Sequence, residues 1–520
     1  MGKQKKRWLK IFGLIIIVLG IGFAIAHYVV KSKIENALTS KLPETVKLTY
    51  GDLGVSLLQG KITLSKVKMT NFGKTIQEPN LEMILEQLII DGFGYWSFLV
   101  NKAIFIEAVI LNSPKVTYHH NPNISKDAYK VSNKQSFNTS IEVKQLLLNQ
   151  GFIKVVNSET DSLKLQMEEV DISLKEIVYN NNNTKKNRIP FDHGTCQVRF
   201  QKFFGQMSDY ENLRISEAAL TQESIVLRDL TLKTKYSKET LSKIIPCERD
   251  HFNLQVDSLV VKQPNLGVVK DTIWKFESPK VAFHKPVFKV YRDKLVTDDE
   301  RIKPLYSKML RELKFQLDLE QVLIHEADIS YSEKVKADKK AGTVRFKAFN
   351  ADIQKVSNTY KSPTKTVLNI ETRFMDHAPL NVVWSFDVNN QEDLFEFQAE
   401  IDLLQARYLN SFTEPNLNVR LEGELDKTHF TISGTDDTSS IDFKVKYQDF
   451  DVVALQDNGQ EKNKLLSDVI NIFVSKNSRS KQSSFKEATK NNIERHKTQS
   501  VFNFIWISAR AGLLKTMTID

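Results

Sequence analysis

Residues 395–403 read Phe-Glu-Phe-Gln-Ala-Glu-Ile-Asp-Leu, a run in which every second side chain is apolar. The same period of two recurs at 252–257, 314–320 and 441–447. Because successive side chains of a strand point to opposite faces, each run predicts a β-strand with one apolar and one polar face. Antiparallel sheets with one solvated side are built from such strands. The chain from about residue 45 to 455 is therefore predicted to be mainly β, as a long, meandering antiparallel sheet.

A long sheet with a continuous apolar face can hide that face in two ways. It can close on itself as a sandwich with a dry core, or curl into an elongated trough whose apolar interior stays partly open. Alternation alone favours the sandwich, because such faces are mostly packed in soluble proteins. The apolar side chains that would line a groove in the second case are Phe252, Leu254, Phe315, Leu317, Leu319, Phe395, Phe397, Ile401, Leu421, Ile441, Phe443 and Val445.

The N-terminal segment predicts a membrane helix. Leu9 to Val30 is apolar except for Lys10 and His27, and a helix of that length spans about 33 Å, enough for a bilayer core. The first ten residues carry five basic and no acidic side chains, which should keep this end cytoplasmic. Residues 1–30 are thus predicted to be a cytoplasmic tail and signal anchor that place the remaining chain across the membrane.

A cleaved signal peptide is the competing interpretation. Ala24-Ile25-Ala26 has the small-x-small form of a cleavage site behind a basic segment. The apolar run continues through Val30, and this favours a retained anchor over cleavage. Both interpretations export residues 31–520.

Composition argues against nucleic-acid binding. The formal net charge is +10, but half of it lies in the first ten residues, and the rest is a mixed-charge surface. The two cysteines, Cys196 and Cys247, could pair in an oxidising compartment, although sequence cannot show whether they meet. No Cys-x-x-Cys motif is present, which argues against a structural zinc site.

The sequence offers no catalytic signature. It contains no nucleophile elbow, no His-Glu-x-x-His, no P-loop and no dinucleotide fingerprint. His119-His120 is the only adjacent histidine pair, and two neighbouring histidines fall short of the three or four ligands that a metal site needs. We therefore expect a non-enzymatic protein without metal or cofactor.

The chain after residue 30 is predicted to divide into three segments. The β-rich exported region, 31–455, is followed by a polar linker at 456–499 with a helix at about 465–474, and by an amphipathic helix at 500–520. This last helix could plug one end of the sheet. It could instead lie at a membrane surface, with the interface contacts Phe502, Trp506 and Arg510.

Four stretches carry a family resemblance. Residues 50–67, Tyr-Gly-Asp-Leu-Gly-Val-Ser-Leu-Leu-Gln-Gly-Lys-Ile-Thr-Leu-Ser-Lys-Val, resemble the opening strands of AsmA-like envelope proteins, which also follow a signal anchor. Residues 104–118 continue the likeness through Asn112-Ser113-Pro114, a strand followed by proline and a second strand. Residues 409–447 and 498–514 are similar to the C-terminal half of that family.

The resemblance implies a groove-shaped β-fold akin to chorein-type bridge-like lipid-transfer proteins, and so it favours the trough over the sandwich. The implied function is the binding or movement of phospholipid, or of another acyl-chain lipid, in support of outer-membrane homeostasis. The implied location is the inner membrane, crossed once, with the bulk of the chain in the periplasm and envelope proteins as further partners. The alternative is a structural or interaction module with a closed β-sandwich core displayed outside the inner membrane.

Overall fold

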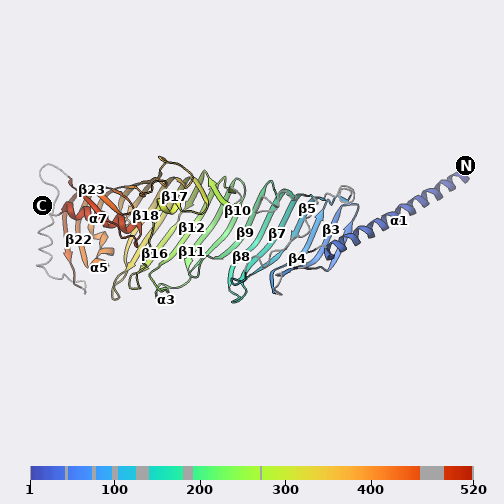
Figure 1. The fold of residues 1–520 in the computed structure, drawn as a ribbon, viewed down its shortest axis with the longest axis horizontal. Coiled ribbons are helices and arrows are strands. Elements are labelled where there is room, and N and C mark those ends of the chain that lie inside the picture. Colours follow the sequence, from blue (N-terminus) through green and yellow to red (C-terminus); the bar gives the residue numbers. More distant parts are fainter. Residues whose placement is uncertain are drawn as a thin grey trace. The chain divides into compact units, whose positions relative to one another are not determined.

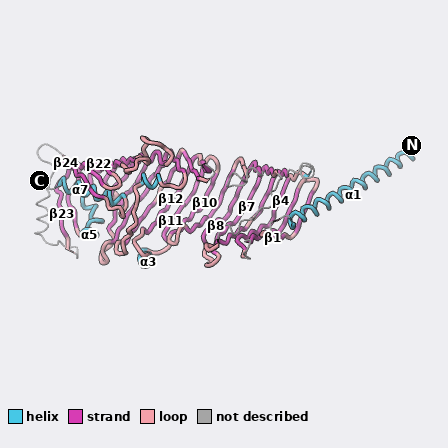
Figure 2. The backbone as a smooth tube through the Cα atoms, in the orientation of Figure 1, coloured by secondary structure: helices cyan, strands magenta, loops and turns pink. Residues whose placement is uncertain are grey.

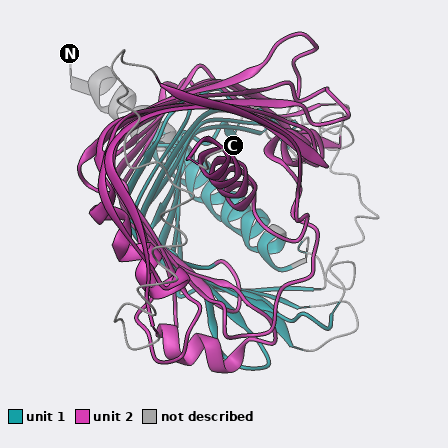
Figure 3. Ribbon diagram, turned by 90° about the vertical axis from the view of Figure 1, so that its left-hand side faces the viewer, with its two compact units in different colours: residues 1–206, 217–222 teal, residues 207–216, 223–520 magenta. Residues whose placement is uncertain are grey.

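The computed structural model describes residues 2–40, 42, 45–72, 78–95, 104–124, 140–179, 191–269, 272–456 and 485–517. In this part of the chain the fold is mainly β, with one helix at each end, as the sequence predicted (Figure 1, Figure 2). The residues fall into two compact units, coloured separately in Figure 3. Unit 1 comprises residues 1–206 and 217–222, and unit 2 comprises residues 207–216 and 223–520. The helix predicted at about 465–474 lies outside the described residues.

Unit 1 holds the N-terminal helix and the first strands. Its elements are α1 (Gly2–Ser40), β1 (Val46–Thr49), β2 (Asp52–Ser56), β3 (Lys61–Phe72), β4 (Pro79–Asp91), β5 (Ile104–Asn112), β6 (Lys115–His120), β7 (Ile141–Asn157), β8 (Leu163–Tyr179) and β9 (Cys196–Gln206). Strand β10 (Glu211–Leu220) has residues in both units.

Unit 2 holds the remaining strands and, among the described residues, four short helical segments besides the C-terminal helix. Its elements are β11 (Ser224–Thr234), α3 (Lys238–Ile244), β12 (Asp250–Lys262), β13 (Asn265–Val269), β14 (Ile273–Ser278), β15 (Lys280–His284), β16 (Val287–Asp293), α4 (Tyr306–Arg311), β17 (Gln316–Lys334), β18 (Gly342–Ser357), β19 (Thr366–Phe374), β20 (Ala378–Phe386), β21 (Phe395–Gln405), the 3-10 helix η3 (Ala406–Leu409), α5 (Asn410–Leu417), β22 (Val419–Gly434), β23 (Thr438–Ala454), β24 (Lys486–Glu494) and α7 (Val501–Met517).

Most neighbouring strands pair antiparallel as predicted, but both units also contain parallel pairs, so the sheet is mixed. In unit 1, β5 and β6 run parallel to β7, and in unit 2, β14, β15 and β16 run parallel to β17. In unit 2 the chain crosses back through residues 294–315 before β17 begins, and such a crossover is what parallel pairing requires. Alternation is the same in parallel and antiparallel strands, so the sequence could not distinguish them.

Each unit contains a series of residues with left-handed backbone conformation on or beside neighbouring strands. Their φ angles lie between 48° and 53°, and they are Lys66, Ser113, Gln150, Glu169 and Lys202 in unit 1 and Asp229, Lys285, Glu326 and Ala348 in unit 2. In β17, two polar residues, His325 and Glu326, separate the apolar Ile324 and Ala327. The phase of alternation therefore slips by one residue, which keeps apolar side chains on the same face on both sides of the slip.

Side chains from neighbouring strands stabilise these slips. The Glu326 N–H donates to Asn350 Oδ1 at 3.0 Å, and the Gln150 N–H donates to Asp171 Oδ1 at 2.9 Å. These contacts satisfy backbone donors that the regular ladder leaves unpaired. Because such irregularities bend a strand and increase its twist, their alignment across neighbouring strands accounts for the curvature of each sheet.

Gly423 lies at a related irregularity between β22 and β23. Its φ is +89°, and a Cβ atom there would approach the Asp449 carbonyl oxygen to 2.1 Å. We expect Gly423→Ala to lower the free energy of unfolding by about 2 kcal/mol or more, because it combines backbone strain with a backbone clash. Chemical denaturation measures the loss. Gly54→Ala is the control, since nothing lies closer than 3.9 Å to its added Cβ; equal effects of the two changes would contradict the argument.

Helix α1 is one continuous helix and extends beyond the predicted boundary at residue 30. Among the described residues, its segment Ile16–Asn36 is long and apolar enough to cross a membrane, and none of the most apolar stretch is buried in the protein. This finding is consistent with single-pass anchoring. Near its end, Ile34 and Leu38 pack against the buried side chains of β2 and β3.

Strand β24 occupies part of the predicted polar linker. Residues Lys486–Glu494 pair antiparallel with β23, and most of their side chains are exposed. The segment Lys-Glu-Ala-Thr-Lys-Asn-Asn-Ile-Glu has almost no apolar alternation. A strand at the edge of a sheet does not need it, and charged side chains there discourage pairing with other chains.

Candidate functional site

Unit 2 carries two unbroken rows of apolar side chains across ten strands, because directly paired residues of neighbouring strands lie on the same face. The first row is Ile225, Val261, Val281, Val322, Ile353, Leu368, Trp384, Phe397, Ile432 and Ile441. The second row is Leu227, Leu259, Phe283, Ile324, Ala351, Ile370, Val382, Ala399, Phe430 and Phe443.

The C-terminal part of this face is sealed. Helix α7 packs on β22, β23 and β24, and Figure 3 shows the sheet of unit 2 curving around it. The ring of Phe504 packs edge-to-face against the ring of Phe395. A Cβ atom on Gly512 would lie 2.9 Å from Phe443 Cβ. Such close approach is possible because the helix presents small residues to the sheet. The Ser508 and Ser439 hydroxyls also form a buried hydrogen bond of 2.8 Å.

The remaining part of the same face, over β11 to β18, is less enclosed. Leu227, Leu259, Phe283 and Ile324 are all only partly buried. In the smaller cluster to which this part belongs, the buried side chains are three valines of β12, β15 and β17. In the described part of the chain, α7 packs on β22, β23 and β24 and not on these strands, so this part has the chemistry of a core without that cover.

Unit 1 has a face of the same kind. One row is Leu53, Leu64, Leu88, Leu111, Leu148, Ile172 and Val198, and the next is Val55, Ile62, Ile90, Val109, Leu146, Leu174 and Cys196. Leu53 and Leu64 are buried beside the end of α1, and from Leu88 onward the members of the first row are partly buried. The end of α1 thus rests on the first strands of this apolar face.

The structure separates the predicted groove residues into two groups. Phe252, Leu254, Leu317 and Leu319 are partly buried, and Phe315 is exposed. The C-terminal residues belong to, or pack against, the core beneath α7, and they are Phe395, Phe397, Ile401, Leu421, Ile441, Phe443 and Val445. The structure packs these seven side chains in a core to which α7 contributes, and alternation alone could not reveal that cover.

The three predicted interface residues share one stripe of α7. Phe502, Trp506 and Arg510 are exposed, while Phe504, Ser508 and Gly512 face the sheet. Phe502 contacts the rings of Tyr306 and Trp384, and Trp506 contacts Phe412 of α5. Helix α7 thus packs on the sheet through one side and leaves this stripe at the surface.

Sequence reasoning missed most of the less enclosed face. Leu259, Phe283 and Ile324 were not among its candidates, and neither was any residue of unit 1. The signal that could have found them is a pair of polar residues inside an alternating run, as in Ile324-His325-Glu326-Ala327, which marks a slip of phase. A search for strict alternation assigns the apolar residues beyond each slip to the opposite face and so excludes them from the candidates.

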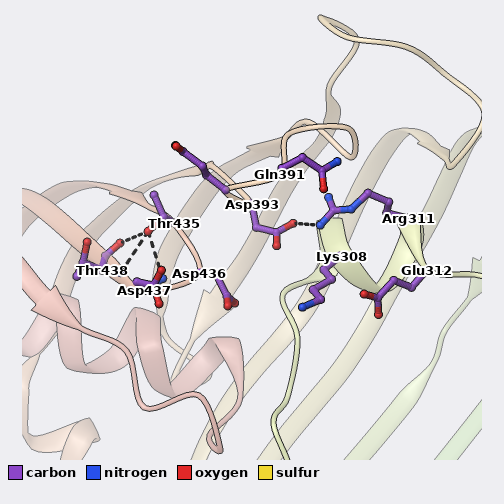
Figure 4. Close-up of a pocket in the computed structure, with 10 residues that line it drawn as sticks. Lys308, Arg311, Glu312, Gln391, Asp393, Thr435, Asp436, Asp437 and Thr438 are labelled. Carbon is purple, nitrogen blue, oxygen red and sulfur yellow. Dashed lines mark hydrogen bonds and ion pairs between the residues drawn. The ribbon is translucent and has the colours of Figure 1, made fainter.

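A polar depression lies between α4 and the ends of β20 to β23 (Figure 4). Arg311 donates to Asp393 at 2.9 Å and to the carbonyl oxygens of Val388 and Asn390 at 2.7 and 3.0 Å. Ser307 also donates to Asp393, at 2.8 Å. These contacts fix the loop before β21 to α4, so the charged groups stabilise structure and are not arranged as a nucleophile with its base.

The opposite face of the sheet carries ion pairs. Lys427 contacts both Glu400 and Asp402, and its hydrogen bond lowers the pKa of Glu400.

Both cysteines are free, and burial raises the pKa of the Cys196 thiol. Within the described ranges, no three His, Cys, Asp or Glu side chains are grouped so that they could hold a metal ion.

Comparison with known proteins assigns no family. No family model matches the chain, and no curated protein matches it.

Proposed function

We propose that this chain is a membrane-anchored, non-enzymatic protein that binds phospholipid or another acyl-chain lipid on its apolar sheet faces. In this proposal it is AsmA-like and works in the periplasm, held by α1 in the inner membrane, where it moves or holds lipid for outer-membrane homeostasis. The observation that carries the proposal is the pair of unbroken apolar rows, of which only the C-terminal part is covered by α7.

The energetics support an acyl chain as the ligand. Each CH₂ group removed from water contributes about 0.8 kcal/mol, and apolar side chains in adjacent rows offer a continuous lining. Over the five paired strands of the less enclosed part, β11, β12, β15, β17 and β18, the rows run for about 19 Å, at about 4.8 Å per strand. Charged side chains on the opposite face keep such a sheet soluble.

The placement of α1 supports the anchored arrangement. Lys3, Lys5, Lys6 and Arg7 precede the apolar segment, as expected for a cytoplasmic end. The other end of α1 rests on the apolar face of unit 1 through Ile34 and Leu38.

The sealed core of unit 2 favours a second candidate, a structural or interaction module. The side chains under α7 form an ordinary closed core, as a displayed β-domain without ligand would have. The two functions differ in what they predict for the less enclosed part of the face.

The test replaces Ile324 by lysine on the less enclosed part of the face. Native mass spectrometry of the gently purified full chain should find bound phospholipid in the parent protein and a loss of that lipid in Ile324→Lys. The reason is that an ammonium group in the lining removes apolar contact and demands water.

Leu323→Lys is the matched control, because Leu323 is the neighbouring residue of β17 and points to the opposite face. Lipid held around α1 is common to all variants, so the difference between them isolates the sheet. Lipid occupancy that is equal in Ile324→Lys and Leu323→Lys would leave the interaction module as the better account.

A further inference from the structure

The apolar face of unit 2 has a blind end. Trp384, on β20, is almost fully buried and contacts the rings of Tyr306 at 5.3 Å and Phe502 at 6.4 Å. Beyond it, α7 covers β22 and β23. An acyl chain that lies over β11 to β18 therefore cannot leave past these aromatic rings without separating α4 and α7 from the sheet.

A hairpin continues the same face sideways. Strands β13 and β14 pair with Leu266 opposite Phe276 and Val268 opposite Trp274. Phe276 lies beside Leu317 of β17 and packs against the valines of the less enclosed face. The apolar face thus extends from the sheet onto one side of the hairpin.

That side of the hairpin is exposed. The exposed fraction of the side chain is 69% for Leu266 and 40% for Trp274, and Phe315, at the start of the neighbouring chain segment, is also exposed. The other side of the hairpin is polar, with Lys275 and Asn265 both bound to Glu277. A hairpin with one such exposed apolar side resembles a binding surface more than a packing surface.

The geometry points to the apolar side of the β13–β14 hairpin as the port through which the acyl chain of a lipid reaches and leaves the apolar face of unit 2. This inference rests on the proposed function and adds where the lipid passes. The hairpin suits this role because its apolar side chains join the lining at Phe276 and Leu317, while the far end of the face is closed by aromatic rings.

Site-specific photocrosslinking tests the port. The full chain, held by α1 in phospholipid nanodiscs, carries p-benzoylphenylalanine in place of Leu266, of Leu259 on the less enclosed face, or of Leu403. Leu403 is a matched control, because it lies on β21 with an exposed fraction of 64%. After irradiation, intact-mass analysis should find phospholipid adducts in the Leu259 and Leu266 variants and no adducts in the Leu403 variant.

The other outcomes separate the two proposals. Adducts at Leu259 without adducts at Leu266 would overturn the port and leave lipid binding in place. Adducts at neither position would overturn both. Adducts at Leu266 without Leu259, or equal adducts at all three positions, would show contact with the nanodisc surface and would also overturn the port.

Discussion

Replacing Ile441 by lysine is expected to unfold the C-terminal part of unit 2. The Ile441 side chain has no exposed surface, and α7 lies directly over it, with Cδ1 of Ile441 3.1 Å from the Cβ position of Gly512. An ammonium group at this site has neither a partner nor a route to water, so we expect a loss of about 4 kcal/mol or more in the free energy of unfolding. This is a large share of a typical total of about 5–15 kcal/mol.

Urea unfolding followed by tryptophan fluorescence measures the effect, since Trp384 and Trp506 both lie in the affected region. The control is Ile324→Lys, the same substitution on the less enclosed part of the same face. Its lysine can direct the ammonium group to water, so we expect a loss of only about 1 kcal/mol. If Ile324→Lys were as destabilising as Ile441→Lys, the whole face would be a sealed core.

Truncating Phe504 to alanine is expected to loosen the plug. The Phe504 side chain is 1% exposed and packs against Phe395 at a ring distance of 6.0 Å. Loss of a buried phenylalanine leaves a cavity and costs about 3–5 kcal/mol. Thermal unfolding monitored by circular dichroism should show a clearly lower midpoint for Phe504→Ala.

Phe502→Ala is the matched control on the same turn of α7. The Phe502 side chain is 61% exposed, so its truncation is expected to cost less than about 1 kcal/mol. An unchanged unfolding midpoint in Phe504→Ala, or equal shifts in both variants, would mean that α7 does not close this end of the sheet.

A charge at Phe397 or Phe443 would not distinguish lipid binding from folding. Phe443 lies beneath α7 and Phe397 packs against the same core. A charge at Phe443 would destabilise the protein whether or not lipid binds elsewhere. Only positions on the less enclosed face, such as Leu259 and Ile324, separate lipid loading from folding.

The period of two by itself determined that the chain is mainly β and that its strands have one apolar face, because strand geometry ties side-chain direction to residue parity. The apolar segment near the N-terminus likewise determined the membrane-spanning candidate, since length and hydropathy are properties of the local sequence. The last helix, predicted at 500–520, is α7 in the structure.

Only the tertiary structure decided which parts of the apolar face are covered. Ile324 and Ile441 both lie in alternating runs, yet Ile324 is partly exposed and Ile441 is buried by α7. Their burial differs because the cover comes from a helix more than fifty residues away in the chain. The parallel pairs and the polar strand β24 could not be predicted from the sequence either. The direction of a strand and its place at the edge of a sheet do not depend on a period of apolar residues. Local patterns record which way a side chain points, and burial depends on what the rest of the chain brings to it.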